Sequence, residues 1–243
     1  MKKYVILIFI LISTNCFSQK MYIKEVKVSQ DLIYPLVIMD DAKLKEKANK
    51  LNNLILKTYL GINVTLNSIK DALLKEQSDA KTEPYSYLEF LSYNVIFNNN
   101  ELFTFDINSF WYVKGTENET KQYNINVSTG ELILMQQAFT ENLHNLIDKK
   151  VKIEFQKRIT QSITKLKNKG NWNEMYKEDL QNYKIETMLL DFRITENGVN
   201  FIYDNQLFSH GDMDCRPNEL YFFSWQEIKS VIKKDSPINS VIN

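Results

Sequence analysis

One short segment near the C-terminal end of the chain contains several side chains that can bind a metal ion. It reads His-Gly-Asp-Met-Asp-Cys from His210 to Cys215. A mixed set of imidazole, carboxylate and thiolate ligands could hold a transition metal, and the candidates are His210, Asp212, Asp214 and Cys215. The spacing matches no established site and lacks the full acidic pattern of an EF-hand loop. A polar loop between two strands is the alternative interpretation.

No residues form a recognisable catalytic centre. A cysteine nucleophile needs a nearby base, and His210 and Cys215 are five residues apart. The sequence contains neither a Gly-x-Ser-x-Gly elbow nor a glycine-rich phosphate loop. A pair of carboxylates could still hydrolyse a glycan, but their separation in space decides this. We therefore expect a protein that is not an enzyme and needs no cofactor, with a cell-wall hydrolase using carboxylate catalysis as the alternative.

Aromatic residues point toward binding. The chain has 13 Tyr, 14 Phe and 3 Trp, and several of them crowd two neighbouring strands between residues 85 and 112. Exposed rings could stack on sugars or anchor a protein partner; alternatively, helices cover the rings and make them part of a core. Trp111 and Tyr112 are consecutive, so they point to opposite faces of a strand. The candidate binding residues are Tyr85, Tyr87, Tyr93, Trp111 and Tyr112.

The periodicity of apolar residues predicts the elements that position these side chains. Extended segments are expected at 20–28 and 33–39, and a helix should follow and end at Gly61, a residue typical of a helix C-terminus. A second helix is expected over 66–77, with Leu74 among its inward residues. From Pro84 onward the period changes to two, which predicts three strands of an antiparallel sheet with one wet face.

The C-terminal half begins with a long predicted helix. Thr140 is its expected cap and Gly170 its end, because one apolar stripe runs between them. Alternation on both sides of Asn197-Gly198 predicts a β-hairpin with a type I′ turn. The stripe of the helix consists of Leu143, Ile147, Val151, Phe155, Ile159 and Ile163. Together these patterns predict an α+β fold with an antiparallel meander sheet packed against two or three helices.

Residues 1–18 have the organisation of a secretory signal peptide. Two lysines precede an apolar run, and Cys16 and Ser18 occupy the positions before a cut at Gln19. The run is too short to span a bilayer, so we expect no transmembrane segment after removal of the signal. The expected location is the periplasm, the cell surface or the medium. A lipoprotein anchored through Cys16 is the alternative, although Asn15 and Ser13 argue against it.

Composition excludes one class of partner. Lys plus Arg and Asp plus Glu both number 30, and a nucleic-acid-binding surface would need a clear basic excess. No nucleic-acid partner is therefore expected. Without Cys16, Cys215 is the only cysteine, so it is either a buried small hydrophobe or a thiol free to pair with another molecule.

Two stretches resemble a known pair of extracytoplasmic domains. Residues 123–134 read Tyr-Asn-Ile-Asn-Val-Ser-Thr-Gly-Glu-Leu-Ile-Leu, followed by Phe139 and the long helix; the second stretch is 199–203 with 221–228. These stretches resemble the outer parts of PdaC-type peptidoglycan deacetylases and RsiV-type anti-sigma factors, the domain families DUF4163 and DUF3298. Residues 111–116 depart from the family pattern because they lack its Gly-Gly-Ala-His segment.

The resemblance implies an accessory role rather than deacetylase chemistry, since the deacetylase's own catalytic domain is missing from the sequence. It also implies a PdaC-like subdomain at 19–118 and an RsiV-like subdomain at 119–243. The predicted function is a secreted binding or sensing domain for a cell-wall glycan or a secreted protein partner.

Overall fold

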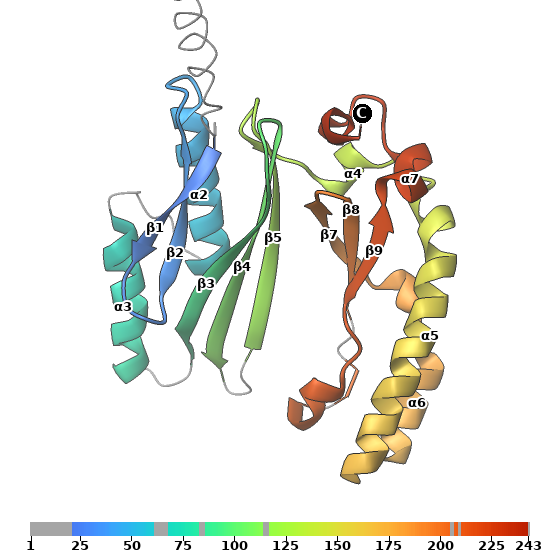
Figure 1. Ribbon diagram of the computed structural model, residues 1–243. Helices are drawn as coiled ribbons and strands as arrows, with labels where there is room; N and C mark the ends of the chain where they lie inside the picture. The colour runs from blue at the N-terminus through green and yellow to red at the C-terminus, as the bar shows by residue number, and fades with distance from the viewer. Residues whose placement is uncertain are drawn as a thin grey trace, which may run out of the picture.

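The computed structural model describes residues 21–60, 68–82, 86–113, 117–204, 207–208 and 210–242. The predicted signal peptide at 1–18, with Cys16 and the cut before Gln19, lies outside these residues, as do Tyr85 and the side chain of His210. The described chain forms two lobes of mixed helices and antiparallel sheets (Figure 1). The predicted α+β class with an antiparallel sheet packed against helices is confirmed.

The N-terminal lobe is built on a four-stranded antiparallel sheet. A hairpin of two strands and two helices lie against one side of this sheet, and Leu32 forms a parallel bridge with Leu91 of its first strand. The sheet strands are β3 (Ser86–Asn98), β4 (Leu102–Val113), β5 (Glu117–Asn126) and β6 (Glu131–Leu132). The covering elements are β1 (Met21–Lys27), β2 (Ile33–Met39), α2 (Lys45–Leu60) and α3 (Ile69–Thr82).

The apolar stripes of the two helices explain how they pack. Ala48, Leu51 and Ile55 of α2 are buried at the three- and four-residue steps that the sequence predicts. In α3, Ile69 and Leu73 are buried, but Leu74 is 42% exposed, so the expectation of an inward Leu74 is wrong. Ile69 and Leu73, four residues apart, lie on one face of the helix, whereas the position next to Leu73 points about 100° away from it.

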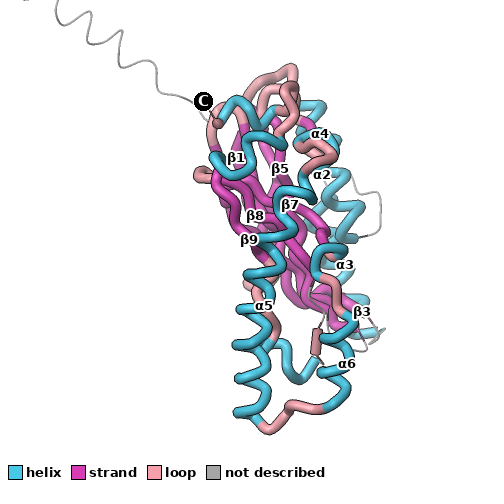
Figure 2. The backbone as a smooth tube through the Cα atoms, turned by 90° about the vertical axis from the view of Figure 1, so that its right-hand side faces the viewer, coloured by secondary structure: helices cyan, strands magenta, loops and turns pink. Residues whose placement is uncertain are grey.

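The second lobe consists of a long helix packed on a three-stranded sheet. Figure 2 shows α5 lying along this sheet, and the six buried apolar residues of α5 belong to one apolar core with the strands. The strands are β7 (Leu189–Thr195), β8 (Gly198–Tyr203) and β9 (Leu220–Ser224). The helices are α4 (Met135–Ala138), α5 (Leu143–Lys169), α6 (Glu174–Asn182) and α7 (Trp225–Ile228), with short 3-10 turns η2 (Ile185–Thr187), η3 (His210–Cys215), η4 (Lys229–Val231) and η5 (Pro237–Val241).

The long helix follows its prediction closely. Gly170 ends it in the left-handed conformation with φ 74°, and its backbone N–H donates to the carbonyls of Leu166 and Lys167. The N-cap is Asn142 rather than Thr140. None of the helices formed by the described residues is long and apolar enough to cross a membrane.

The hairpin between β7 and β8 is confirmed, but its predicted turn type is wrong. Thr195 pairs with Gly198, so the two turn residues are Glu196 and Asn197. Phe208 is the only described non-glycine residue with positive φ, which excludes a type I′ turn. Glycine is required at position 198 because β9 passes beside it: a Cβ atom there would lie 2.1 Å from the carbonyl oxygen of Phe223.

The outer edge of β9 is held by cations of α5. Arg158 Nη1 donates to the carbonyl oxygens of Asn218, at 2.6 Å, and Leu220, at 2.9 Å. Lys150 Nζ donates to the carbonyl oxygen of Phe222 at 3.0 Å. The helix is therefore joined to the sheet by polar bonds at its margin as well as by the core.

The β3–β6 sheet of the N-terminal lobe contributes to both apolar cores. One side belongs to the N-terminal core, and Phe97 and Leu102 on the other side join the core of the second lobe. The predicted subdomain boundary after residue 118 falls inside β5, which pairs with β4 from Glu117 to Asn126. The division into subdomains 19–118 and 119–243 stays a prediction.

Candidate binding site between the two lobes

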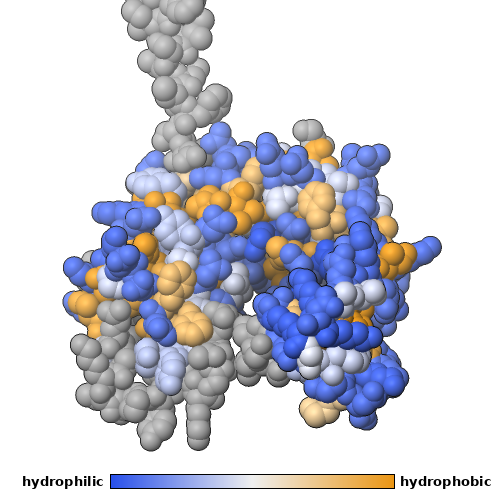
Figure 3. Space-filling view, turned by 60° about the horizontal axis from the view of Figure 1, so that its bottom comes forward, coloured by the Kyte–Doolittle hydropathy of each residue, from blue (hydrophilic) through white to orange (hydrophobic). Residues whose placement is uncertain are grey.

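A cleft of about 830 Å³ opens between the lobes. The space-filling view shows it as a hollow separating two masses of side chains (Figure 3). Its walls come from β5 on one lobe, and from β7, β8 and the segment leading into β9 on the other. Segments far apart in the sequence thus meet at one surface.

Strand alternation determines which residues of the central sheet lie on the side that faces the second lobe. Phe103, Phe105 and Ile107 of β4 are fully buried in the N-terminal core. The alternate residues of β4 therefore point to the opposite side, toward the second lobe. We call this the cleft side of the sheet; on β4 it comprises Thr104, Asp106, Asn108, Phe110 and Tyr112.

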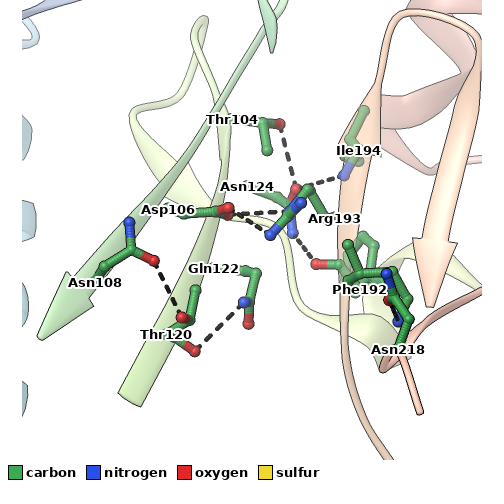
Figure 4. A network of polar contacts seen from close by, with 11 residues as sticks. Thr104, Asp106, Asn108, Thr120, Gln122, Asn124, Phe192, Arg193, Ile194 and Asn218 are labelled. Atoms are coloured by element: carbon green, nitrogen blue, oxygen red, sulfur yellow. Dashed lines mark hydrogen bonds and ion pairs between the residues drawn. The ribbon is translucent and has the colours of Figure 1, made fainter. Parts of the chain in front are cut away.

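At the end of the sheet near Thr104, which we call the upper end, β7 covers the cleft side through direct hydrogen bonds. Asn124 of β5 donates from Nδ2 to the carbonyl oxygen of Phe192 at 2.8 Å, and its Oδ1 accepts from the N–H of Ile194 at 2.9 Å (Figure 4). Thr104 donates to the same Oδ1 at 3.2 Å. The side-chain amide of Asn124 thus makes the pair of bonds that a neighbouring strand would make with β7.

A buried ion pair lies beside this amide. Arg193 of β7 reaches Asp106 of β4 through both Nε and Nη2, and the Nε to Oδ1 distance is 3.1 Å. The two side chains are 15% and 6% exposed. Burial raises the pKa of Asp106 to about 6, although the Arg193 guanidinium acts in the opposite direction. We call Thr104, Asp106, Asn124 and Arg193 the interlobe network.

Below the interlobe network the lobes diverge, and the polar side chains bond to groups of their own sheet. Thr120 Oγ1 donates to Asn108 Oδ1 at 3.0 Å, and Gln122 Nε2 donates to the carbonyl oxygen of Thr120 at 3.3 Å. Thr120 and Gln122 line the cleft. This part of the sheet presents amides and hydroxyls to the open space.

Ionisable groups on the second lobe complete the cleft. Burial raises the pKa of Asp191, with the Phe192 N–H and Lys121 acting against the rise. The pKa of Glu219 is also raised, although the residue as a whole is exposed: partial desolvation of the carboxyl group and the charge of Asp204 raise it, while Arg216 opposes the rise. The cleft thus combines carboxyl groups of raised pKa with the cations of Lys121, Arg193 and Arg216.

The opposite end of the cleft side, near Tyr112, consists of aromatic residues; we call it the lower end. Tyr87 and Tyr112 are cross-strand partners, and their rings stack with centroids 5.1 Å apart and planes inclined by 24°. Phe90 pairs with Phe110 on the same side. Tyr112 is 42% and Phe90 41% exposed. An accessible aromatic surface therefore continues the polar strip formed by Asn108 and Thr120.

The structure separates the aromatic residues that the sequence proposed as a group. Tyr87 and Tyr112 lie together on the cleft side, whereas Trp111 packs against the N-terminal core. Tyr93 pairs with Ile107, also on the core side, and its hydroxyl donates to Glu25 Oε1 at 2.9 Å. Tyr85 lies outside the described residues. The opposite orientations of Trp111 and Tyr112 follow the expectation from alternation.

The proposed metal ligands that the structure describes are occupied by protein groups. Asp212 is buried and accepts from Asn171 Nδ2 at 2.6 Å and from the Tyr176 hydroxyl at 2.8 Å. Asp214 forms an ion pair with Lys169 at 2.6 Å. Cys215 is fully buried with a free thiol, as its interpretation as a small hydrophobe requires.

Within the described part of the chain, no group of three or more His, Cys, Asp or Glu residues could hold a metal. The side chain of His210 is outside that part, so a site that includes it stays a prediction. Asp212 and Asp214 have an evident structural role, because they connect η3 to Asn171, just beyond α5, to Lys169 at its end and to Tyr176 of α6.

Sequence reasoning missed the residues that form the cleft and the interlobe network. Asp106 and Asn124 stand at polar positions of alternating strands, which indicated only a solvated side of a sheet. Their partner Arg193 comes from a different hairpin, 87 residues from Asp106 in the chain. The charged residues Asp191 and Arg193, which alternate with apolar residues in the strand at 189–195, were the available signal.

Comparisons with known proteins bear on the fold. No family model matches the sequence, and no curated protein matches it significantly. A member of the DUF3298 family from Bacteroides fragilis has a similar structure, with a TM-score of 0.59 and 13% identity over 93% of this chain and 98% of that chain. A DUF3298 family protein from Pseudomonas aeruginosa gives a TM-score of 0.49 and 9% identity over 89% and 95% of the two chains.

The first of these similarities shows that the chain shares the fold of the Bacteroides fragilis protein along nearly its whole length. It supports the DUF3298 part of the resemblance seen in the sequence. The relation to PdaC-type deacetylases, to RsiV-type anti-sigma factors and to DUF4163 stays a prediction.

Proposed function

We propose that the chain is a non-enzymatic binding protein of the periplasm or cell surface, and that it binds a linear cell-wall glycan along the cleft side of its central sheet. The observation that carries this proposal is the continuity of one surface. The stacked rings of Tyr87 and Tyr112 lie on the same side of the sheet as Asn108 and Thr120, and Thr120 also lines the cleft. The location rests on the organisation of residues 1–18.

The chemistry of this surface suits a sugar chain. Each pyranose ring has an apolar face that can lie on an aromatic ring and a rim of hydroxyls that can bond to amides and carboxylates. The aromatic end supplies the first kind of contact and Asn108, Thr120 and Gln122 supply the second. A cleft of about 830 Å³ is within the usual range for small-ligand sites.

Binding of this kind should be weak. Association costs several kcal/mol of translational and rotational freedom, which a few stacked rings offset only in part. We expect a dissociation constant on the order of 10–1,000 μM, equivalent to about 4–7 kcal/mol. Truncating the exposed aromatic pair should remove a large fraction of this free energy.

The test is calorimetric titration of the protein with defined peptidoglycan oligomers and with chitin oligomers. Tyr87→Ala/Tyr112→Ala should bind at least tenfold more weakly than wild type. Tyr22→Ala is the matched control, because Tyr22 is 38% exposed on β1, in the hairpin on the other side of the sheet. Equal affinities of the wild type and the double variant would exclude the aromatic surface. No heat with any oligomer would contradict the glycan proposal as a whole.

The raised pKa values of Asp191 and Glu219 favour a second candidate, a cell-wall hydrolase that uses carboxylates. A carboxyl group whose pKa is raised is a better candidate for a general acid than an ordinary carboxyl group. Mass analysis of the same oligomers after prolonged incubation separates the two functions. Time-dependent products that disappear in Asp191→Asn or Glu219→Gln would replace the binding proposal with the hydrolase.

A further inference from the structure

A second recess, which adjoins the cleft, lies where α5 meets the segment before β9. It has a volume of about 430 Å³. Its lining includes the cations Lys157, Arg158, Lys165 and Arg216, and one carboxylate, Glu154. Cations from two elements distant in the sequence therefore surround one space.

Several acceptors in this recess already have donors from the chain. Glu154 Oε1 accepts from Arg158 Nε at 3.2 Å. The carbonyl oxygen of Asn218 accepts from Arg158, and its Oδ1 accepts from the N–H of Leu220 at 2.7 Å. The ammonium groups of Lys157 and Lys165 have no carboxylate within ion-pair distance among the described residues. The recess thus has an excess of donors over acceptors.

Arg216 is the most informative of these donors. Its Nη2 donates to the carbonyl oxygen of Phe208 at 3.1 Å, which fixes the guanidinium. Its Nε is buried and has no hydrogen-bond partner in the described structure. A buried N–H without an acceptor is rare and costs free energy, so Arg216 keeps unused hydrogen-bonding capacity at the margin of the recess.

We propose that this recess binds a phosphate group. A phosphate ester carries close to two negative charges and three acceptor oxygens, which matches several converging cations better than a single carboxylate does. Arginine binds phosphate through its planar donor fork, and lysine contributes a mobile charge. Arg216 and Asn218 line both this recess and the cleft, so a phosphate here would sit directly behind one wall of the glycan surface. The site does not depend on the glycan proposal.

The test measures binding of three probes to the secreted protein by amide chemical shifts in NMR spectra. The probes are inorganic phosphate, glycerol phosphate, and phosphatidylcholine vesicles with and without phosphatidylglycerol. For the soluble probes, we expect saturable shifts around Arg216, with an affinity that falls as NaCl rises from about 50 to about 200 mM because salt screens exposed charges.

The variant Lys157→Gln/Lys165→Gln should weaken binding at least tenfold. The charge-matched control Lys70→Gln/Lys149→Gln removes two exposed lysines outside the recess and should change affinity less than twofold. Arg216→Gln should also abolish the saturable shifts, but its bond to Phe208 gives it a structural role, so the lysine pair decides the test if this variant does not fold.

The three probes distinguish the source of the phosphate. Binding of glycerol phosphate but not of vesicles supports a soluble phosphate ester, and binding of both supports a lipid headgroup; binding of inorganic phosphate alone supports the free ion. Equal losses in the lysine pair and its control would mean bulk charge attraction and would overturn the proposal. Binding to anionic vesicles without glycerol phosphate, or no saturable shift near Arg216, would overturn it as well.

Discussion

The upper and lower halves of the cleft side have the same alternation and similar polar residues, yet their environments differ completely. In the upper half, Thr104, Asp106 and Asn124 are buried at 4% exposure or less. In the lower half, Asn108 is only partly buried and Thr120 is exposed. The two asparagines show the contrast: Asn124 bonds to the backbone of β7, whereas Asn108 bonds to a neighbouring hydroxyl.

This comparison shows that coverage by the second lobe determines whether the polar residues form structural hydrogen bonds or stay accessible to a ligand. Where β7 covers the sheet, an amide and a carboxylate become structural bonds, because a buried polar group must find a partner. Where β7 diverges, the same types of residue stay available to a ligand. Substitutions in the upper half should therefore change stability, and those in the lower half should change binding.

The largest expected effect comes from breaking the buried ion pair. Arg193→Met leaves the Asp106 carboxylate buried without its cation, which should lower the free energy of unfolding by about 3–5 kcal/mol at pH 8. Urea denaturation followed by circular dichroism measures this. The double variant Arg193→Met/Asp106→Leu should recover most of the loss. Equal midpoints for wild type and the single variant would mean that the pair does not hold the lobes together.

The pH dependence of the free energy of unfolding should report on Asp106, which also lies in the upper half. Asp106 has a pKa of about 6 in the folded protein against a usual value of 3.8. Between these values the folded state keeps a proton that the unfolded state has lost, so stability is greatest below pH 4 and falls as pH rises through 6. The contribution is on the order of 2–3 kcal/mol.

Asp106→Asn removes this titration. The difference in urea midpoint between the variant and wild type should shift in favour of the variant from pH 4.5 to pH 7. A difference that stays constant over this range would show that Asp106 titrates normally.

The smallest expected change in stability gives the most direct comparison of the two halves, because an asparagine is replaced by alanine in each of them. Asn124→Ala leaves the carbonyl of Phe192 and the N–H of Ile194 without partners and should cost about 1–3 kcal/mol. Asn108→Ala should stay within about 0.5 kcal/mol of wild type while weakening glycan binding. Thermal unfolding of both variants measures the stability effect. Equal losses would remove the distinction between the halves.

Local patterns predicted those parts of the fold that depend on local interactions. The stripe of α5 and its end at Gly170 follow from helix periodicity and from the need for a left-handed residue. Alternation likewise predicted β3, β4 and β5. The turn at Gly198 was misjudged because the reason for glycine is the passage of β9, more than 20 residues later.

The cleft could not be predicted for the same physical reason. Lys121, Asp191 and Glu219 come from three separate segments, and only the packing of the second lobe on the sheet places them around one space. The raised pKa values also depend on that burial. Tyr87 and Tyr112 were within reach of sequence reasoning because they belong to adjacent strands of one meander.

The bonds from α5 to the margin of β9 have a consequence for how this protein behaves at high concentration. A strand with free carbonyls at the edge of a sheet is a template on which another chain can add and start aggregation. Arg158 and Lys150 occupy the carbonyls of Asn218, Leu220 and Phe222, and each places a positive charge where a second backbone would have to approach. The long helix thus protects this edge of β9 against pairing with a strand of another molecule.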